Sequence, residues 1–224
     1  MSLFEEHKAE RRARILVAAR RLIAARGYDG LTMRELAKAS RVSVPTLYNL
    51  FGGKRALLLA ELEETFATVA ASLAQAGGSS VVERAFAVCD AGNRDLLAVP
   101  RYTRELVQLF LTSEETQPMR REIGERYIAL MAGILRDGQA AGELATWADP
   151  TTVASRSFAH YTHTMIQWAQ GELDAEEFRA ATTYGMCLML LGLARGSIAR
   201  ELERRAQEVQ TAMARRDSRA RKRG

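Results

Sequence analysis

The segment SVPTLYN, residues 43–49, gathers side chains that recognise partners through hydrogen bonds, not side chains that make or break covalent bonds. Leu47, Leu50 and Phe51 recur at helical spacing and are expected to face a core. The other positions then face outward and mix hydroxyl, phenol and amide groups with apolar ones: Val44, Pro45, Thr46, Tyr48 and Asn49. The first hypothesis is therefore a short helix that presents its first turn to a partner.

Catalytic or metal-binding sets are not evident elsewhere in the sequence. There is no Ser/His/Asp or Cys/His set and no glycine-rich phosphate loop, so we predict a protein that is not an enzyme and needs no cofactor. His160 and His163 lie three residues apart on a predicted helix, which can direct both at one metal ion. No further ligand has a matching spacing, and a buried or interfacial histidine pair is the favoured alternative. No metal is predicted.

The composition indicates a cytoplasmic protein without a membrane segment. The chain has 224 residues, of which 47% are apolar, enough for one large domain or two smaller ones. Two cysteines far apart in sequence favour a reducing compartment. The charged start MSLFEEHKAERRAR lacks the apolar region of a signal peptide. The longest apolar run, near residues 186–194, is much shorter than the roughly 18 residues of a membrane span.

Charge is distributed unevenly along the chain. Residues 1–55 carry twelve Lys or Arg and five Asp or Glu, residues 56–203 carry twelve and twenty, and residues 204–224 carry eight and two. A basic head suggests a polyanionic partner, and an ordinary solvated surface is the alternative. The basic tail is equally consistent with a weak attraction to DNA and with a role in solubility.

Two short helices are predicted in the head, after an amphipathic first helix with an Arg-rich outer side. Thr32 is expected to cap the second helix, and Glu35 completes a capping box. Ser43 is expected to cap the third helix, and Pro45 falls in its first turn, where a missing N–H does little harm. Two capped helices joined by a short turn are typical of a helix-turn-helix, whose second helix enters the major groove of DNA. An ordinary three-helix packing unit is the alternative.

A family resemblance covers this region. The segment GYDGLTMRELAKASRVSVPTLYNLFGGKRALL, residues 27–58, resembles the DNA-binding region of the tetracycline-repressor (TetR) family, and RILVAARRLIAARG extends the resemblance to about residue 14. One departure is visible, because the family usually has Ala-Gly in the turn where this chain has Ser40 and Arg41. Glycine eases a left-handed backbone, so Arg41 is expected to add up to about 1 kcal/mol of strain, together with a cation.

The resemblance implies DNA contacts for ten residues: Thr32, Arg34, Arg41, Ser43, Val44, Pro45, Thr46, Tyr48, Asn49 and Lys54. Thr32, Arg34, Tyr48 and Lys54 are expected at phosphates, with a base as a second target for Arg34. Asn49 is the expected base reader, because Asn can pair with adenine through two hydrogen bonds.

The rest of the chain is predicted to be helical, so the expected fold class is all-α. A three-helix DNA-binding domain over residues 1–55 precedes a larger helical domain over residues 56–200 and a basic, partly disordered tail over residues 201–224. The last body helix is expected from residue 174 to about residue 199. Three glycines within residues 184–198 indicate close helix packing, either across a dimer interface or within one chain.

The resemblance also implies a body that binds a small molecule and forms a homodimer. Nine residues on predicted body helices combine the aromatic, apolar and polar groups of a ligand chamber: Tyr102, Arg104, Gln108, Tyr127, Met131, Arg156, His160, Thr164 and Trp168. Ordinary interiors have the same composition, and that reading is favoured for each residue taken singly. Arg104 and Arg156 would suit an anionic ligand, but an ion pair with a neighbour such as Glu105 is the favoured role.

These features predict a ligand-responsive transcriptional regulator, of the repressor kind that is commonest in the family. It would bind a palindromic operator in double-stranded DNA as a homodimer and leave it when an unknown small-molecule effector favours another body shape. The alternative is an architectural or effector-independent DNA-binding protein, against which the long body argues.

Overall fold

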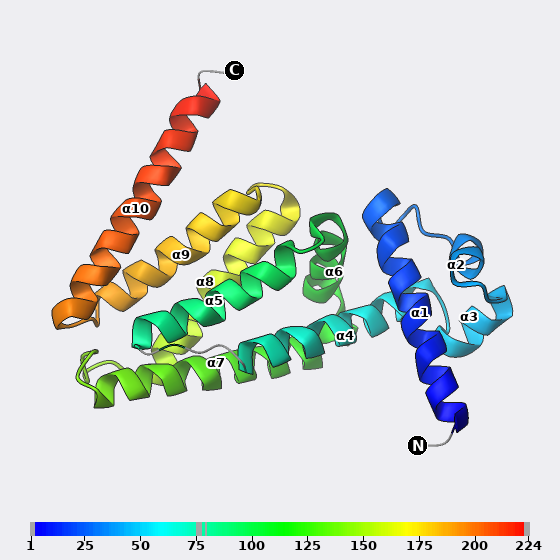
Figure 1. Cartoon of the computed structure of the whole chain (residues 1–224), viewed down its shortest axis with the longest axis horizontal. Helices are drawn as coiled ribbons and strands as arrows, with labels where there is room; N and C mark the ends of the chain where they lie inside the picture. The colour runs from blue at the N-terminus through cyan, green and yellow to red at the C-terminus, as the bar shows by residue number, and fades with distance from the viewer. Residues whose placement is uncertain (1–2, 75–77, 79, 222–224) are drawn as a thin grey trace. The chain divides into compact units, whose positions relative to one another are not determined.

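The structure is a computed structural model that describes residues 3–74, 78 and 80–221 (Figure 1). The helices of this described part are α1 (Leu3–Arg26), α2 (Met33–Ser40), α3 (Val44–Phe51), α4 (Lys54–Ala74), α5 (Val81–Leu97), α6 (Pro100–Thr112), the 3₁₀ helix η1 (Glu114–Thr116), α7 (Gln117–Ala140), α8 (Pro150–Gln170), α9 (Ala175–Leu191) and α10 (Gly196–Arg221). An isolated bridge between Leu144 and Ala194 is the one pairing of extended backbone among these residues. The predicted all-α class is confirmed.

Packing divides the chain into two compact units. Unit 1 comprises the described parts of Met1–Thr68 and Leu96–Gln117, and unit 2 those of Val69–Asp95 and Pro118–Gly224. The predicted head, residues 1–55, lies within unit 1, which also includes the first part of α4 and all of α6. Contacts between α1 and α6 hold this larger group together, so the division by packing differs from the predicted boundary at residue 55.

The core of unit 1 stabilises two helices that are too short to be stable alone. α2 and α3 have eight residues each, whereas an isolated helix needs about 12–15. α1 contacts α2, and α2 contacts α3. The buried apolar side chains of the unit include Ile15, Leu16, Ile23, Leu36, Leu47, Phe51, Leu57 and Leu106. The α2–α3 pair therefore depends on this shared core and on its end caps.

The core of unit 2 draws on α5 and α7–α10. Its buried members include Val82, Phe86, Met131, Ile134, Ala154, Cys187, Leu190 and Leu202. α9 packs against both α8 and α10. The guanidinium of Arg205 lies 4.0 Å from the centroid of the Phe86 ring, which joins α10 to α5 by a cation–π contact.

The predicted last body helix, from residue 174 to about residue 199, is wrong at its C-terminal end. α9 ends at Leu191, and α10 begins at Gly196, whose φ is 57°. Between them Leu193 accepts a hydrogen bond from the N–H of Ala145 (2.8 Å). Backbone groups must find partners, and this loop finds them in the α7–α8 connection instead of in a continuous helix.

The break is not evident in the sequence, where all three glycines are also compatible with helix packing. Gly185 does lie at a close helix crossing, but the crossing is within the chain, since a Cβ there would come 2.0 Å from Nε2 of His160 on α8. Gly192 and Gly196 belong to the end of α9 and the start of α10. Gly185 thus follows the alternative of packing within one chain, whereas Gly192 and Gly196 lie at helix ends, which was not predicted.

The predicted tail begins inside α10. Ile198, Leu202 and Ala206 of this helix are buried, so its first part belongs to the packed core of unit 2. Further along, Met213 is 36% exposed, and the helix continues to Arg221. Residues 222–224 of the predicted tail lie outside the described residues.

Candidate nucleic-acid interface

Thr32 begins the candidate interface at the N-terminus of α2. Its Oγ1 accepts a hydrogen bond from the N–H of Glu35 (3.2 Å) and donates one to Oε2 of Glu35 (3.0 Å). Arg26 pairs with the other carboxylate oxygen of Glu35. The Thr32 hydroxyl and then Arg26 hold the pKa of Glu35 below its usual value, with a further contribution from the Thr32 backbone. The Thr32 half of the predicted capping box is therefore present, and the Glu35 carboxylate reaches back to the Thr32 hydroxyl.

Arg41 forms the turn between α2 and α3 in the left-handed region, with φ of 55° and ψ of 48°. It is the one non-glycine residue with positive φ in the described part of the chain. The N–H of Val42 donates to the carbonyl of Ala37 (3.0 Å), which closes the C-terminus of α2. The turn keeps the conformation that glycine would favour, and the exposed Arg41 side chain adds a cation to it.

Ser43 caps α3 as predicted. Its Oγ accepts a hydrogen bond from the N–H of Thr46 (3.2 Å) and lies 2.7 Å from Oγ1 of Thr46. Leu47 and Phe51 turn inward and are buried. The guanidinium of Arg12 on α1 lies 4.7 Å from the Phe51 ring centroid, so a cation–π contact also holds the end of α3.

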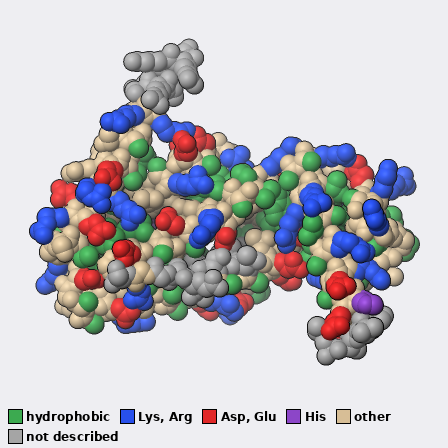
Figure 2. Space-filling model, viewed as in Figure 1, with side chains coloured by type: hydrophobic (Ala, Val, Ile, Leu, Met, Phe, Trp, Pro, Cys, Tyr) green, Lys and Arg blue, Asp and Glu red, His purple; other side chains and the backbone are tan. Residues whose placement is uncertain are grey.

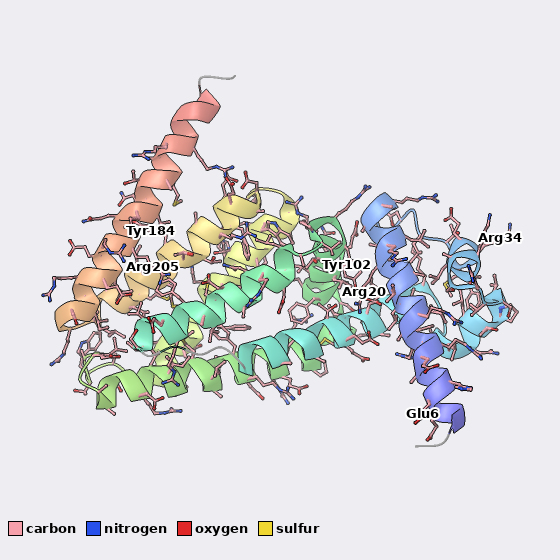
Figure 3. All side chains as sticks on the ribbon, viewed as in Figure 1. Glu6, Arg20, Arg34, Tyr102, Tyr184 and Arg205 are labelled. Atoms are coloured by element: carbon pink, nitrogen blue, oxygen red, sulfur yellow. The ribbon has the colours of Figure 1, made fainter. Side chains whose placement is uncertain are left out.

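The outward face of α3 is open to solvent. Tyr48 is 50% exposed, Pro45 and Asn49 are exposed, and Val44 and Thr46 are half-buried. Exposed cations flank this face: Arg34 extends from α2 away from the rest of its unit, and Arg41 occupies the turn (Figure 3). Lys and Arg side chains are frequent on the part of the surface that unit 1 presents (Figure 2).

Lys54 begins α4, and its ammonium is held in place by an aromatic ring. Its Nζ lies 4.1 Å from the centroid of the Tyr28 ring. Burial raises the pKa of Tyr28, so the ring stays neutral and suited to a cation–π contact. Neighbouring Arg55 donates from Nε to Glu115 (3.2 Å) and from NH2 to Ser113 (2.9 Å). Lys54 is the first residue of α4, so its ammonium belongs to a helix N-terminus, where free N–H groups also attract anions.

Comparison with known families identifies this arrangement. A family model described as "Bacterial regulatory proteins, tetR family" matches residues 15–60, which run from α1 through the start of α4. The chain matches the TetR family over this DNA-binding region. It is a TetR-family transcriptional regulator, and that family is not a family of enzymes.

A curated relative and the solved structures agree with this assignment. The protein "HTH-type transcriptional repressor KstR" from Mycolicibacterium smegmatis is 29% identical over 141 residues, covering 61% of this chain and 69% of that protein. A TetR-family regulator from Marinobacter aquaeolei has a TM-score of 0.69 at 15% identity, covering 88% of this chain and 98% of its own. A structure titled "gamma-butyrolactone receptor (ArpA like protein)" has a TM-score of 0.60 at 19% identity, covering 92% and 99%. At these identities the two structures show the shared fold alone.

The nine predicted ligand residues are divided between the two units. Tyr102, Arg104 and Gln108 lie in unit 1, and the other six lie in unit 2. Tyr102 is buried, Arg104 is half-buried and Gln108 is exposed. In unit 2, Met131 and Trp168 belong to the interior.

The polar ligand candidates of unit 2 are mostly engaged within the chain. The Tyr127 hydroxyl lies 2.9 Å from Oγ of Ser157. Oγ1 of Thr164 donates to the carbonyl of His160 (2.9 Å), and Nε2 of His160 lies 3.2 Å from the carbonyl of Ala181. Arg156 is exposed. Ligand contact by these residues stays a prediction.

The described residues contain neither a cluster of metal-ligating side chains nor a membrane-spanning helix. No group of three or more His, Cys, Asp or Glu side chains there is arranged to hold a metal ion, and His163 is exposed. No helix in the same part of the chain is both long enough and apolar enough to cross a membrane.

The sequence reading did not single out a buried carboxylate, Glu61 on α4. Its side chain has no exposed surface, and Oε2 accepts hydrogen bonds from Nε of Arg20 on α1 (2.6 Å) and from the hydroxyl of Tyr102 on α6 (Figure 3). Burial raises the pKa of Glu61, against the opposing effects of Arg20 and Tyr102. A glutamate among the apolar residues of one helix face was the available signal, since Leu57, Leu58 and Leu62 are buried around it.

Proposed function

We propose that this TetR-family regulator binds a palindromic operator as a homodimer, acts as a repressor, and leaves the operator when a small-molecule effector binds its body. The observation that carries the DNA-binding part is α3, an eight-residue helix capped by Ser43 that leaves Pro45, Tyr48 and Asn49 exposed. A short, exposed recognition helix fits the major groove. Repression is supported by the relative that is named a transcriptional repressor.

On DNA, the exposed and flanking side chains divide into two groups. Asn49 reads a base edge, because its amide has both a donor and an acceptor, and Val44 and Pro45 contact apolar base edges. The side chains that contact phosphates are Thr32, Arg34, Arg41, Tyr48 and Lys54, whereas Ser43 and Thr46 belong with Val44, Pro45 and Asn49 to the surface that faces the bases. The hydroxyls of Thr32, Ser43 and Thr46 already take part in caps, which aims these helix N-termini at the phosphates.

Dimerisation is assigned to an apolar strip on α9. Leu188 is 51% exposed, and Tyr184 and Leu191, at helical spacing on either side of it, are partly buried. An apolar strip on a surface helix marks an interaction site, and most homodimers bring identical faces together about a two-fold axis.

If an effector in the body is to release DNA, the body must be connected to the head. The Glu61 side chain provides such a connection within unit 1. It joins α1 of the predicted head to α4 and to α6 through Arg20 and Tyr102. α4 continues along the chain from unit 1 into unit 2. An effector that favours one arrangement of α4 and α6 would therefore shift α1, provided that it binds the two arrangements with different affinity. A solved structure of this fold is titled a receptor, which supports a ligand-responsive body.

Binding selection on random duplex DNA tests the proposal. We expect the purified protein to select an inverted repeat whose half-sites lie one or more helical turns apart, with two chains per duplex in analytical ultracentrifugation. Selection of no sequence, with binding that depends only on salt, would instead establish the architectural alternative. Selection of a single unrepeated half-site by a monomer would contradict the dimer.

A further inference from the structure

The N-terminal part of α1, residues 5–14, carries side chains that bury almost no surface. All of them are exposed except Arg12, which is half-buried, and the first buried side chain after residue 5 is Ile15. α1 runs past α2 and α3 at this end, and Glu6 lies near its tip (Figures 1 and 3). We call residues 5–14 the arm. An isolated helix of this length is marginal in water, so the arm gains little from packing that would explain its presence.

The arm lies outside the region that matches the family. The TetR family model covers residues 15–60, so the match begins where the buried face of α1 begins. Neither the family match nor the helix-turn-helix therefore accounts for the arm. Its role must be sought in its own residues and in what lies next to it.

The half of the arm nearest the packed part of α1 is basic. Between residues 8 and 14 four side chains are basic and one, Glu10, is acidic, which gives a net charge of +3. Lys8, Arg11 and Arg14 make no hydrogen bond or ion pair with any described residue. Residues three apart on a helix are neighbours, so these three cations form a row along one side of α1.

Other arginines of α1 have partners within the fold. Arg20 pairs with the buried Glu61, and Arg26 pairs with Glu35 at the start of α2. These arginines join α1 to its neighbouring helices. The row of arm cations joins α1 to no other described element, so it is available for an anionic partner outside the chain.

Arg12 fixes the position of the arm beside α3. Its NH1 donates to the carbonyl of Leu50 (3.4 Å), and its guanidinium lies 4.7 Å from the centroid of the Phe51 ring. Both partners belong to the C-terminal end of α3. Lys8 precedes Arg12 by four residues, so it lies on the same side of α1, one turn and about 6 Å further out. The basic row therefore begins next to the helix that is proposed to read the operator.

We propose that the arm binds phosphates of the DNA that flanks each operator half-site, through Lys8, Arg11 and Arg14. Lys and Arg are common phosphate ligands, and such contacts position a protein without reading sequence. Residues 5–12 span about 10 Å of helix, which equals about three base pairs of duplex. The inference rests on the proposed DNA-binding function, to which it adds a contact surface beyond the α2–α3 pair and Lys54.

Two duplexes that contain the selected operator separate flanking contacts from operator contacts. One ends at the outer edges of the half-sites, and the other continues for about one helical turn, about 10 base pairs, on each side. The full-length protein should bind the longer duplex more tightly. Its log K should also fall more steeply with log salt, by about 0.9 for each additional phosphate contact. Equal affinity and equal slope on the two duplexes would overturn the inference.

Arg11→Ala tests the arm, and Arg21→Ala is the matched control. Arg21 is exposed on the same helix, likewise pairs with no described residue, and lies ten residues, or about 15 Å, further along α1. Arg11→Ala should reduce the salt slope on the longer duplex by about 0.9 for each chain and leave binding to the shorter duplex unchanged. Lys8→Ala should do the same, and Arg21→Ala should leave the difference between the duplexes intact. Equal effects of Arg11→Ala and Arg21→Ala would show a general effect of charge and no contact by the arm.

Hydrogen exchange distinguishes a contact at the arm from attraction at a distance. Amides of the arm should exchange rapidly in the free protein, because the helix is marginal there. They should be protected on the longer duplex and not on the shorter one. The unfolding midpoint of Arg11→Ala in urea should equal that of the wild type, because its side chain has no partner to lose. Rapid exchange on both duplexes, or a lower midpoint for Arg11→Ala, would contradict the proposal.

Failure of the arm and failure of the proposed function give different results. If no sequence is selected, the operator-binding function fails. The arm is then tested on random duplex, where a smaller salt slope for Arg11→Ala than for Arg21→Ala supports it and equal slopes reject it. If the operator is selected but the duplexes behave alike, the function stands and the arm inference fails. A change in the sedimenting mass of free Arg11→Ala would place the arm in a protein interface instead of on DNA.

Discussion

At the scale of single residues, the head separates side chains that hold the fold from side chains that are left for DNA. The hydroxyls of Thr32 and Ser43 each accept a backbone N–H at a helix start. Asn49 and Tyr48, by contrast, are exposed on the outer face of α3. Substitutions in the second group should therefore change DNA binding without changing stability, whereas the first group affects both.

Asn49→Ala should relax the choice of base at one operator position and leave the other positions unchanged, because the amide is the group that distinguishes bases. Tyr48→Phe and Lys54→Ala should weaken binding by a similar factor on all sequences, because phosphates carry no sequence information. Gel-shift titrations on the selected operator and its single-base variants measure both effects. An equal loss of affinity on every site for Asn49→Ala would show that Asn49 contacts a phosphate and not a base.

Arg41→Gly should raise the free energy of unfolding by up to about 1 kcal/mol, because the residue sits at φ of 55°, where a Cβ is unfavourable. Urea unfolding of the full chain measures this change. Lys38→Gly, within α2, is the control and should lower stability by a similar amount. The same Arg41→Gly protein should bind DNA more weakly at low salt because it lacks one cation. A loss of stability on Arg41→Gly would show that the arginine side chain makes a stabilising contact.

At the scale of elements, the packing of helices depends on a single side chain at two junctions. In unit 1, α1, α4 and α6 meet at the buried Glu61. In unit 2, α8 and α9 cross where His160 fills the space beside Gly185. The first junction depends on Glu61, and Glu64 is its control. The second depends on His160 beside Gly185, and Gly133 on α7 is its control.

Glu61→Ala should lower the free energy of unfolding by about 2 kcal/mol, because the buried Tyr102 hydroxyl loses its acceptor. Glu64→Ala should lower it by less than about 1 kcal/mol, because Glu64 is 47% exposed and its pair with Arg20 is screened. Chemical denaturation of both variants and the wild type gives these values.

The same variants test the raised pKa of Glu61. The folded protein holds this proton more tightly than the unfolded chain, so wild-type stability should fall as pH rises from 4.5, the usual value, through the raised one. Glu64→Ala should retain this fall, and Glu61→Ala should lack it. Identical pH profiles for the two variants would contradict burial as the dominant cause.

Gly185→Ala should destabilise the protein by about 1–3 kcal/mol, because the new Cβ would meet the His160 ring and force a shift. Gly133→Ala on α7 is the control: nothing lies within 4 Å of its Cβ position, so helix propensity alone should raise stability. The double variant Gly185→Ala/His160→Ala should recover part of the loss. Thermal unfolding compares all three proteins, and an unchanged midpoint for Gly185→Ala would show that α8 and α9 separate easily.

At the scale of the whole molecule, charge and an apolar strip point to its two macromolecular partners. The excess of basic residues in residues 1–55 matches a polyanion, and the acidic excess in residues 56–203 keeps DNA away from the body. In the proposed dimer, the exposed Leu188 on α9 is the apolar surface that would contact the second copy.

Leu188→Glu should convert the homodimer to a monomer, because it buries a charge in the centre of the apolar strip. Sedimentation velocity measures the mass, and operator affinity should fall by orders of magnitude as the second head is lost. Met213→Glu is the control, a partly exposed apolar residue on α10, and it should leave the mass unchanged. A Leu188→Glu protein that remains dimeric would place the interface elsewhere.

The sequence allowed much of this to be predicted because local signals agree with the fold. The caps at Thr32 and Ser43 were predicted from short-range hydrogen-bonding rules, and their geometry is as expected. The end of α9 was not predicted, because hydrogen bonds from a distant loop decide it. Glu61 was missed for the same reason: its significance depends on which residues lie opposite it, and a single sequence contains no such information.

The short length of α3 has a consequence for the kinetics of DNA binding. Eight residues held at both ends by the chain itself are already in place before any DNA arrives. Conformational freedom is therefore lost once, during synthesis, and not again at every encounter. In the proposed regulator, DNA binding and release would then need no disorder-to-order step in α3, and the response time would depend on the effector.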